Sequence, residues 1–171
     1  MILLICGSLR AGSGNAAVLG TVATLTASKT YTGLGDLPHF NPDDDRDPLH
    51  PEVASLRAAI KEADAVLICT PEYAGGLPGS FKNLLDWTVG GGEMYGKPVA
   101  WINASSVAAP TGGRDAHDSL RKVLTYAGAK IVDEACARIP VSRADVADGQ
   151  VADPDLRGRI AVAVMHLRAA G

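Results

Sequence analysis

The 171-residue sequence lacks several features, and each absence removes a class of protein. It contains no apolar run approaching the ~20 residues that a membrane-spanning helix needs. The apolar start, Met1–Cys6, is too short for a signal peptide and has neither a basic beginning nor a small-residue cleavage site. We therefore expect a protein without a membrane partner that works in the cytoplasm.

Cysteines and basic stretches are also scarce. The three cysteines, Cys6, Cys69 and Cys136, are odd in number and far apart, which argues against a disulfide framework. No Cys-x-x-Cys or zinc-binding pair occurs, and the acidic run Asp43–Asp45 near His39 is typical of a solvated loop, so we expect no metal site. A formal net charge of −3 without a basic tract also argues against a nucleic-acid partner. No repeat or long linker divides the chain, and residues 1–171 are expected to form one domain.

Five short apolar or β-rich runs alternate with stretches of helical periodicity. Continuous apolar runs are typical of strands that helices cover on both faces. The alternation predicts an α/β fold with a parallel sheet and right-handed crossovers. The last helix has the clearest start, because Asp153 is suited to the N-cap and Pro154 to the first helical position. The expected strands are Ile2–Cys6, Lys29–Leu34, Ala65–Thr70, Pro98–Asn103 and Lys130–Val132.

The stretch GSLRAGSGN, Gly7–Asn15, follows the first expected strand. Ligands of open parallel sheets bind outside the carboxyl ends of the strands, and a helix N-terminus there attracts phosphate. The loop adds hydroxyl, amide and guanidinium donors to the backbone N–H groups, and its glycines allow a close approach. The candidate ligands in this loop are Ser8, Arg10, Ser13, Gly14 and Asn15.

The same loop also fits a dinucleotide-binding fingerprint. Gly12, Gly14 and Ala17 match G-x-G-x-x-[GA], and Asp36 lies at a suitable distance beyond them. That fingerprint begins where the strand ends, whereas here Gly7–Ala11 intervenes. A pyrophosphate is held mainly by backbone, so the loop's many side-chain donors favour the terminal monophosphate of a mononucleotide. Both interpretations remain open at the level of spacing.

A second loop, TPEYAGGLPGSFKNLLDW at Thr70–Trp87, follows the third expected strand. Together the two loops resemble the NADPH-dependent FMN reductase family, whose motifs read roughly G-S-x-R-x-x-S-x-N and P-E-Y-N-x-x-x-P-G-x-L-K-N-x-x-D-W. Both motifs occur in the right order and spacing. The resemblance implies a flavodoxin-like three-layer sandwich with a five-stranded parallel sheet in the order 2-1-3-4-5.

The resemblance also assigns roles to residues of the loops. Ser8, Arg10, Ser13 and Asn15 would hold the FMN phosphate. One departure is Ala74, which stands where the family usually has Asn; backbone contacts survive this change, so FMN binding is still expected. The residues expected along the isoalloxazine ring are Pro71, Glu72, Tyr73 and the backbone of Ala74, Gly75 and Gly76; the third loop adds Ser105 and then Ser106, with Gly112 and Gly113 near the nicotinamide.

The activity implied by the resemblance is that of an FMN-dependent NAD(P)H oxidoreductase. A hydride would pass from NAD(P)H to FMN, and two electrons would then reach a quinone, flavin, azo or metal-ion acceptor. No catalytic side chain is required by this chemistry. Family members are commonly homodimers or homotetramers, and the helix opened by Pro78 is the expected contact surface.

Two other functions remain as alternatives. A flavodoxin-type one-electron carrier is disfavoured by the modest net charge and by Tyr73 being alone where carriers commonly use two aromatic rings. A flavin-free Rossmann-type NAD(P) dehydrogenase is the other. Trp87 and Trp101 are expected in the core or an interface, and His117 on a helix surface.

Overall fold

The structure, a computed structural model, describes residues 1–105 and 110–171. Its main sheet is parallel, with the order β2-β1-β3-β4-β5 and a short β6 also paired with β4. This order confirms the predicted fold and differs from the dinucleotide-binding order of a Rossmann fold. The strands are β1 (Ile2–Cys6), β2 (Ser28–Tyr31), β3 (Ala65–Cys69), β4 (Pro98–Asn103), β5 (Lys130–Ile131) and β6 (Ala137–Arg138).

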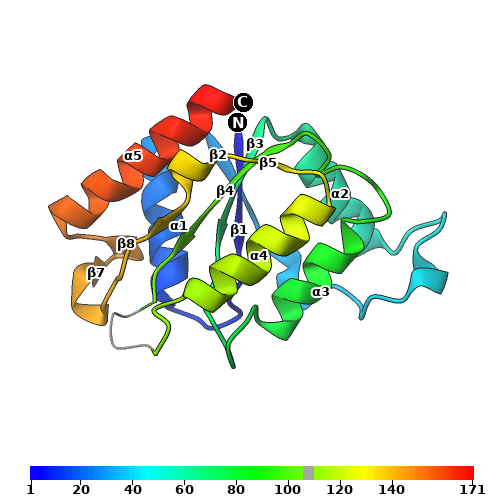
Figure 1. Ribbon diagram of the computed structural model, residues 1–171, viewed down its shortest axis with the longest axis horizontal. Helices are drawn as coiled ribbons and strands as arrows, with labels where there is room; N and C mark the ends of the chain where they lie inside the picture. Colours follow the sequence, from blue (N-terminus) through cyan, green and yellow to red (C-terminus); the bar gives the residue numbers. More distant parts are fainter. Residues whose placement is uncertain (106–109) are drawn as a thin grey trace.

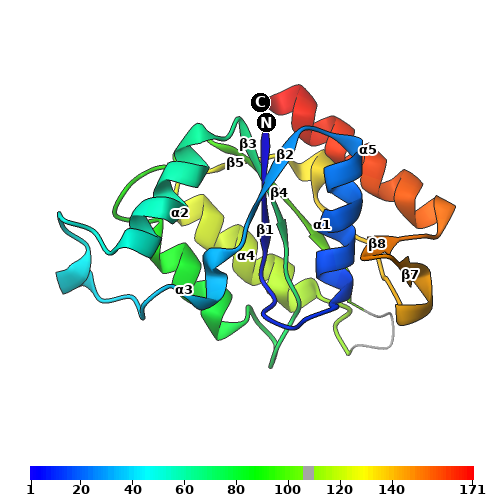
Figure 2. The ribbon, with the colours of Figure 1, turned by 180° about the vertical axis from the view of Figure 1, so that it is seen from behind.

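Helices cover both faces of the sheet (Figure 1, Figure 2). One face packs against α1 (Gly14–Leu25) and α5 (Pro154–Ala170), and the other against α2 (Pro51–Glu62), α3 (Gly79–Trp87) and α4 (Arg114–Tyr126). Successive strand residues point to opposite faces, so Leu4 joins the first apolar cluster while Leu3 and Ile5 join the second. This double burial explains why the central strands are apolar throughout.

Three strand predictions differ from the structure at their ends; the third strand differs only by Thr70, which lies beyond its end at Cys69. The second strand stops at Tyr31, because Gly33–Gly35 forms a 3₁₀ turn that tucks Leu34 into the core. The last strand is interrupted by a second 3₁₀ turn at Asp133–Ala135, and the chain then pairs with β4 again as β6. Asp153 caps α5 as predicted, with its carboxylate accepting from the Leu156 N–H at 2.9 Å.

A small hairpin, β7 (Val146–Ala147) and β8 (Gln150–Val151), was not predicted. Strands of two residues have no periodicity to detect, although the Asp148-Gly149 pair between them is a favoured hairpin turn. The hairpin lies beside α1 and carries the chain to α5 (Figure 1). Within the described residues, no helix combines the length and hydropathy required to cross a bilayer.

Candidate functional site

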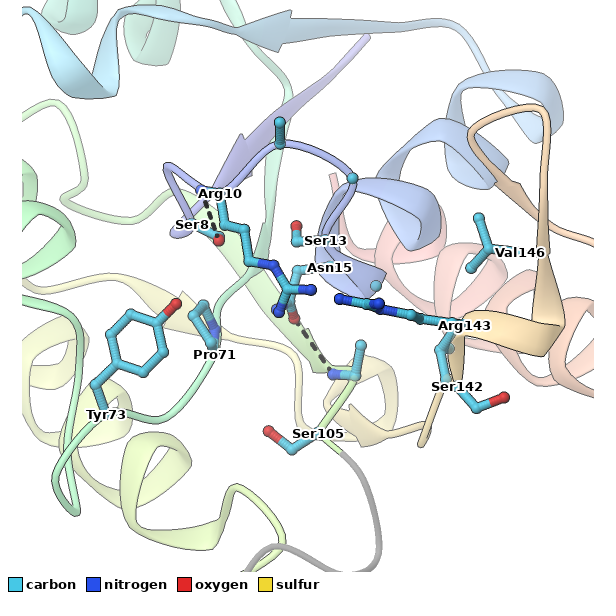
Figure 3. Close-up of a pocket in the computed structure, with 15 residues that line it drawn as sticks. Ser8, Arg10, Ser13, Asn15, Pro71, Tyr73, Ser105, Ser142, Arg143 and Val146 are labelled. Atoms are coloured by element: carbon cyan, nitrogen blue, oxygen red, sulfur yellow. Dashed lines mark hydrogen bonds between the residues drawn. The ribbon is translucent and has the colours of Figure 1, made fainter.

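A cavity of about 550 Å³ lies beside the loop that follows β1. Its volume falls within the roughly 300–1,000 Å³ that is usual for small-molecule and cofactor pockets. Figure 3 shows that its lining side chains come from four segments far apart in the sequence. Three are the predicted loops after β1, β3 and β4, and the fourth is Val141–Val146.

The loop after β1 is arranged around the N-terminus of α1. The Ser13 hydroxyl caps this helix by accepting from the Ala16 N–H at 3.1 Å. The Ser8 hydroxyl accepts from the Arg10 N–H at 3.2 Å, which tightens the turn. Gly12 has a φ of +64°, a conformation that glycine adopts without steric cost. The helix start therefore directs its dipole at the cavity, together with the first-turn N–H groups that precede Ala16.

Asn15 of α1 bonds to the ends of two strands, β3 and β4. It is buried, and its Oδ1 accepts from the Ala104 N–H at 3.3 Å and from the Cys69 thiol at 3.2 Å. The carbonyl end of the amide is therefore used to hold the loops after β3 and β4 against α1. Contact of Asn15 with a phosphate stays a prediction.

Two guanidinium groups enter the cavity from opposite sides. Arg10 comes from the loop after β1 and Arg143 from the segment before β7, and they point toward each other in Figure 3. Among residues 1–105 and 110–171, neither has a carboxylate within ion-pair distance. Guanidinium stays protonated in proteins, so this end of the cavity is strongly electropositive.

The loop after β3 contributes Pro71 and Tyr73 to the lining, and Tyr73 begins a tight turn that ends at Gly76. The N–H of each of these two residues donates to the carbonyl of the other, at 3.0 and 3.1 Å. Ala74 and Gly75 have φ angles of +50° and +73°, the pattern of a type I′ turn. Tyr73 is 53% exposed and lines the cavity, with its ring beside Pro71 (Figure 3).

Glu72 is directed away from the cavity toward the start of α4. Its Oε2 accepts from the Ala116 N–H at 3.0 Å, and its Oε1 accepts from the Thr111 hydroxyl. Partial burial opposes ionisation, but these hydrogen bonds and the backbone of Asp115 outweigh it and hold the pKa of Glu72 below its ordinary value. The carboxylate thus ties the loop after β3 to α4.

The structure brings most of the predicted site residues together. Glu72 and Ala74–Gly76 belong to the same loop but do not line the cavity, and Ser106 lies outside the described residues. Ligand contact stays a prediction for all of them. The predicted residues that line the cavity are Ser8, Arg10, Ser13, Gly14, Asn15, Pro71, Tyr73 and Ser105.

The fourth segment was missed by sequence reasoning. It contributes Val141, Ser142, Arg143 and Val146 to the lining. A signal existed, because Ser142 and Asp145 have the S-x-x-D spacing of a capping box, and the structure forms one there. That pattern indicates a turn, but it does not indicate which helix the turn packs against.

The prediction for His117 was wrong. Its ring is half-buried against Trp101, with ring centroids 5.8 Å apart, and Nε2 has no hydrogen-bond partner among the described residues. Burial, helped by the charge of Arg138, lowers the pKa of His117 to about 4. The imidazole is therefore neutral at pH 7. Trp87 and Trp101 are in the core, as expected.

The sheet order and an electropositive cavity at a capped helix N-terminus are characteristic of mononucleotide-binding α/β proteins. Residues 1–141 match the NADPH-dependent FMN reductase family. The 2-hydroxy-1,4-benzoquinone reductase of a Burkholderia species is 35% identical over 165 residues, which cover 91% of this chain and 87% of that protein. The quinone reductase of Escherichia coli strain K12 is 30% identical over 161 residues, covering 89% and 85%.

A solved structure agrees with these relatives. The flavoenzyme NAD(P)H:(acceptor) oxidoreductase FerB from Paracoccus denitrificans has a TM-score of 0.83 and 30% identity, covering 99% of this chain and 98% of that one. The chain belongs to the NADPH-dependent FMN reductase family, which confirms the resemblance seen in the sequence. It is an FMN-dependent NAD(P)H oxidoreductase with a small-molecule acceptor.

Proposed function

We propose that the protein reduces small quinones with NAD(P)H, through FMN bound between the two arginines and the Tyr73–Gly76 turn. The observation that carries this proposal is one cavity with an electropositive end at α1 that is also lined by Tyr73, the first residue of the turn after β3. The quinone is suggested by two relatives that are named as quinone reductases. When bound, FMN supplies the redox chemistry, taking a hydride from NAD(P)H and giving two electrons to an acceptor.

The donors at the α1 end fit a phosphate monoester. Arg10 offers a fork of N–H donors that matches phosphate oxygens, and the first turn of α1 adds backbone N–H groups and its dipole. The Ser8 and Ser13 hydroxyls already accept from backbone N–H groups, which leaves their O–H protons free to be donated. These groups hold the cofactor by its charged end.

The turn at the other end fits the edge of a flat ring. Its own hydrogen bonds use the N–H groups of Tyr73 and Gly76, and within residues 1–105 and 110–171 those of Ala74 and Gly75 make none, so they are left for a ligand. Glu72 fixes this turn against α4 through the Ala116 N–H. The role of the loop is to position backbone donors, which is why it tolerates Ala74 in place of the family's Asn.

One side of the cavity is left open to other molecules. Tyr73 is the single aromatic among the described residues that line it, so the described protein provides no second ring to cover a flavin from the other side. An uncovered ring face admits nicotinamide and then a flat acceptor. This feature supports an enzyme rather than a one-electron carrier.

Turnover tests the proposal directly. FMN-loaded protein is expected to oxidise NADPH rapidly with 1,4-benzoquinone and slowly without it, as followed by the loss of NADPH absorbance. The same protein tested with free flavin, an azo dye and ferricyanide ranks the acceptors. Flavin-loaded protein that turns over none of them would favour the carrier, and a dye preferred over every quinone would replace the quinone assignment.

We also propose that residues 1–171 act as one domain, that the chain forms a homodimer or homotetramer, and that it works in the cytoplasm. Two apolar clusters on a shared sheet support the first proposal, a single domain.

The proposed subunit contact lies next to α3. Val89 and Tyr95, which follow α3, are 60% and 81% exposed and support a contact surface there. Free thiols at Cys6, Cys69 and Cys136 fit a reducing compartment. Light scattering after size exclusion measures the subunit number.

A further inference from the structure

Arg143 lies outside the part of the chain that matches the family, which ends at residue 141. It also lies outside the three loops whose motifs point to FMN. We propose that Arg143 is a second cation for the FMN phosphate and makes the site select FMN over unphosphorylated riboflavin. This inference rests on the proposed binding of FMN in the cavity, and it adds a specificity-determining residue to that site.

The position of Arg143 is set locally by a capping box. The Ser142 N–H donates to the Asp145 carboxylate at 2.7 Å, and the Asp145 N–H donates back to the Ser142 carbonyl. Asp145 is the acidic residue nearest to Arg143 in the sequence. Because its carboxylate is held by the Ser142 backbone, it does not neutralise the guanidinium. The charge of Arg143 therefore remains available to a ligand.

The same segment is packed onto the helix that forms the phosphate end. The buried Val151 N–H of β8 donates to the Thr21 hydroxyl of α1 at 2.9 Å. Gly20 meets the hairpin so closely that a Cβ there would lie 2.5 Å from the Gly149 carbonyl oxygen. At the start of α1, a Cβ on Gly14 would lie 3.4 Å from the Val141 carbonyl oxygen. Arg143 is thus held in register with the N-terminus of α1.

Charge balance indicates what lies between the two arginines. Two like charges that share a cavity repel each other, and the described residues provide no carboxylate to compensate them. A phosphate monoester carries a charge of about −1.5 to −2 near pH 7, so one arginine leaves it incompletely neutralised and two match it. Riboflavin lacks this group and gains nothing from either cation. The preference for FMN is therefore the property that Arg143 controls.

The test compares two flavins on apoprotein, with affinity measured from the quenching of flavin fluorescence. Arg143→Ala is expected to raise the Kd for FMN about 10-fold, which is the usual effect of losing one charge-assisted hydrogen bond. The Kd for riboflavin is expected to stay within about 2-fold of the wild-type value. Arg143→Lys keeps the charge and is expected to recover much of the loss. Arg46→Ala, in an exposed loop away from the cavity, is the matched control and should change neither flavin.

Each result decides the inference. Unchanged FMN affinity in Arg143→Ala, or an equal loss of FMN and riboflavin, would overturn it, since the second result indicates a structural role. A KM increase for NADPH but not NADH, with the FMN preference intact, would instead place Arg143 on the 2′-phosphate of NADPH. Wild-type protein that binds riboflavin as tightly as FMN would show that the proposed phosphate end itself is wrong.

Discussion

The two ends of the cavity are built from different interactions. At the phosphate end, exposed side chains of Arg10 and Arg143 face a helix N-terminus, and nothing in the described chain neutralises them. At the ring end, a backbone turn closed by its own hydrogen bonds is clamped to α4 through Glu72. The first end recognises charge and the second recognises shape. Substitutions at the two ends should therefore change different properties.

A second comparison lies within the turns themselves. Ala74-Gly75 and Asp148-Gly149 have nearly the same backbone, with φ angles of +50° and +73° in the first pair and +50° and +74° in the second. The β7–β8 turn has Asp at the left-handed position, where Asp is tolerated, whereas the ring-end turn has Ala, which is disfavoured there. The strained residue is the one in the loop that contributes Pro71 and Tyr73 to the site, as is common in functional loops.

The largest effect is expected from Arg10→Ala. This change removes a charged donor from the phosphate end, so the Kd for FMN should rise about 10- to 100-fold while that for riboflavin stays nearly constant. Equilibrium dialysis of apoprotein with each flavin measures both values. An equal rise in the Kd for both flavins would show that Arg10 supports the fold. It would contradict the proposal that this end of the cavity recognises the charge of the phosphate.

Gly20→Ala tests how the hairpin that carries Arg143 is attached to α1. The new methyl group would lie 2.5 Å from the Gly149 carbonyl oxygen, so the hairpin must shift. We expect a net loss of about 1–2 kcal/mol in the free energy of unfolding, because the clash outweighs the gain in helix propensity.

The control for this change is Gly158→Ala in α5. A Cβ there meets nothing within 4 Å, so only the helix propensity changes. Stability should rise by about 0.5–1 kcal/mol in urea unfolding. If Gly20→Ala stabilises the protein as Gly158→Ala does, the close packing of hairpin and helix is wrong.

Glu72→Gln tests the hydrogen bonds by which Glu72 holds the loop after β3 against α4. We expect the free energy of unfolding to fall by about 1 kcal/mol at pH 7, because the bonds to Ala116 and Thr111 are weakened. The pKa of Glu72 is lower in the folded protein than in the unfolded chain, so its stabilisation is complete above the unfolded pKa. It is lost as the pH falls through the folded pKa. Urea unfolding at several pH values should show the wild type and the variant converging in acid; a constant difference would contradict the clamp.

The smallest effects are expected from a pair of opposite changes in the two turns. Both positions have a left-handed backbone, which Asn and Asp tolerate better than Ala does. Ala74→Asn should therefore stabilise the protein by about 0.5–1 kcal/mol, and Asp148→Ala should destabilise it by a similar amount. Thermal unfolding of both variants measures the difference. If both variants shift the unfolding temperature in the same direction, the left-handed backbone does not have the same effect on stability in the two turns.

The sequence predicted the features that depend on local residue identity. Ser13 as part of the loop at the start of α1, Asp153 as a cap and the apolar central strands all follow from a few neighbouring residues. Contacts between distant segments were not predictable in this way. Arg143 belongs to a segment whose hairpin is bonded to α1 through Val151 and Thr21, and Glu72 bonds to the N-terminal turn of α4. His117 is half-buried because Trp101 of β4 lies against it.

The most direct test of the account is a comparison of cofactor retention. Apoprotein is mixed with excess FMN or with excess riboflavin and passed through a desalting column, and the visible flavin absorbance of the protein fraction is recorded. We predict a stoichiometric amount of FMN that NADPH bleaches, and little riboflavin. Protein that emerges without FMN, or with both flavins equally, would contradict a site that holds its cofactor by the phosphate.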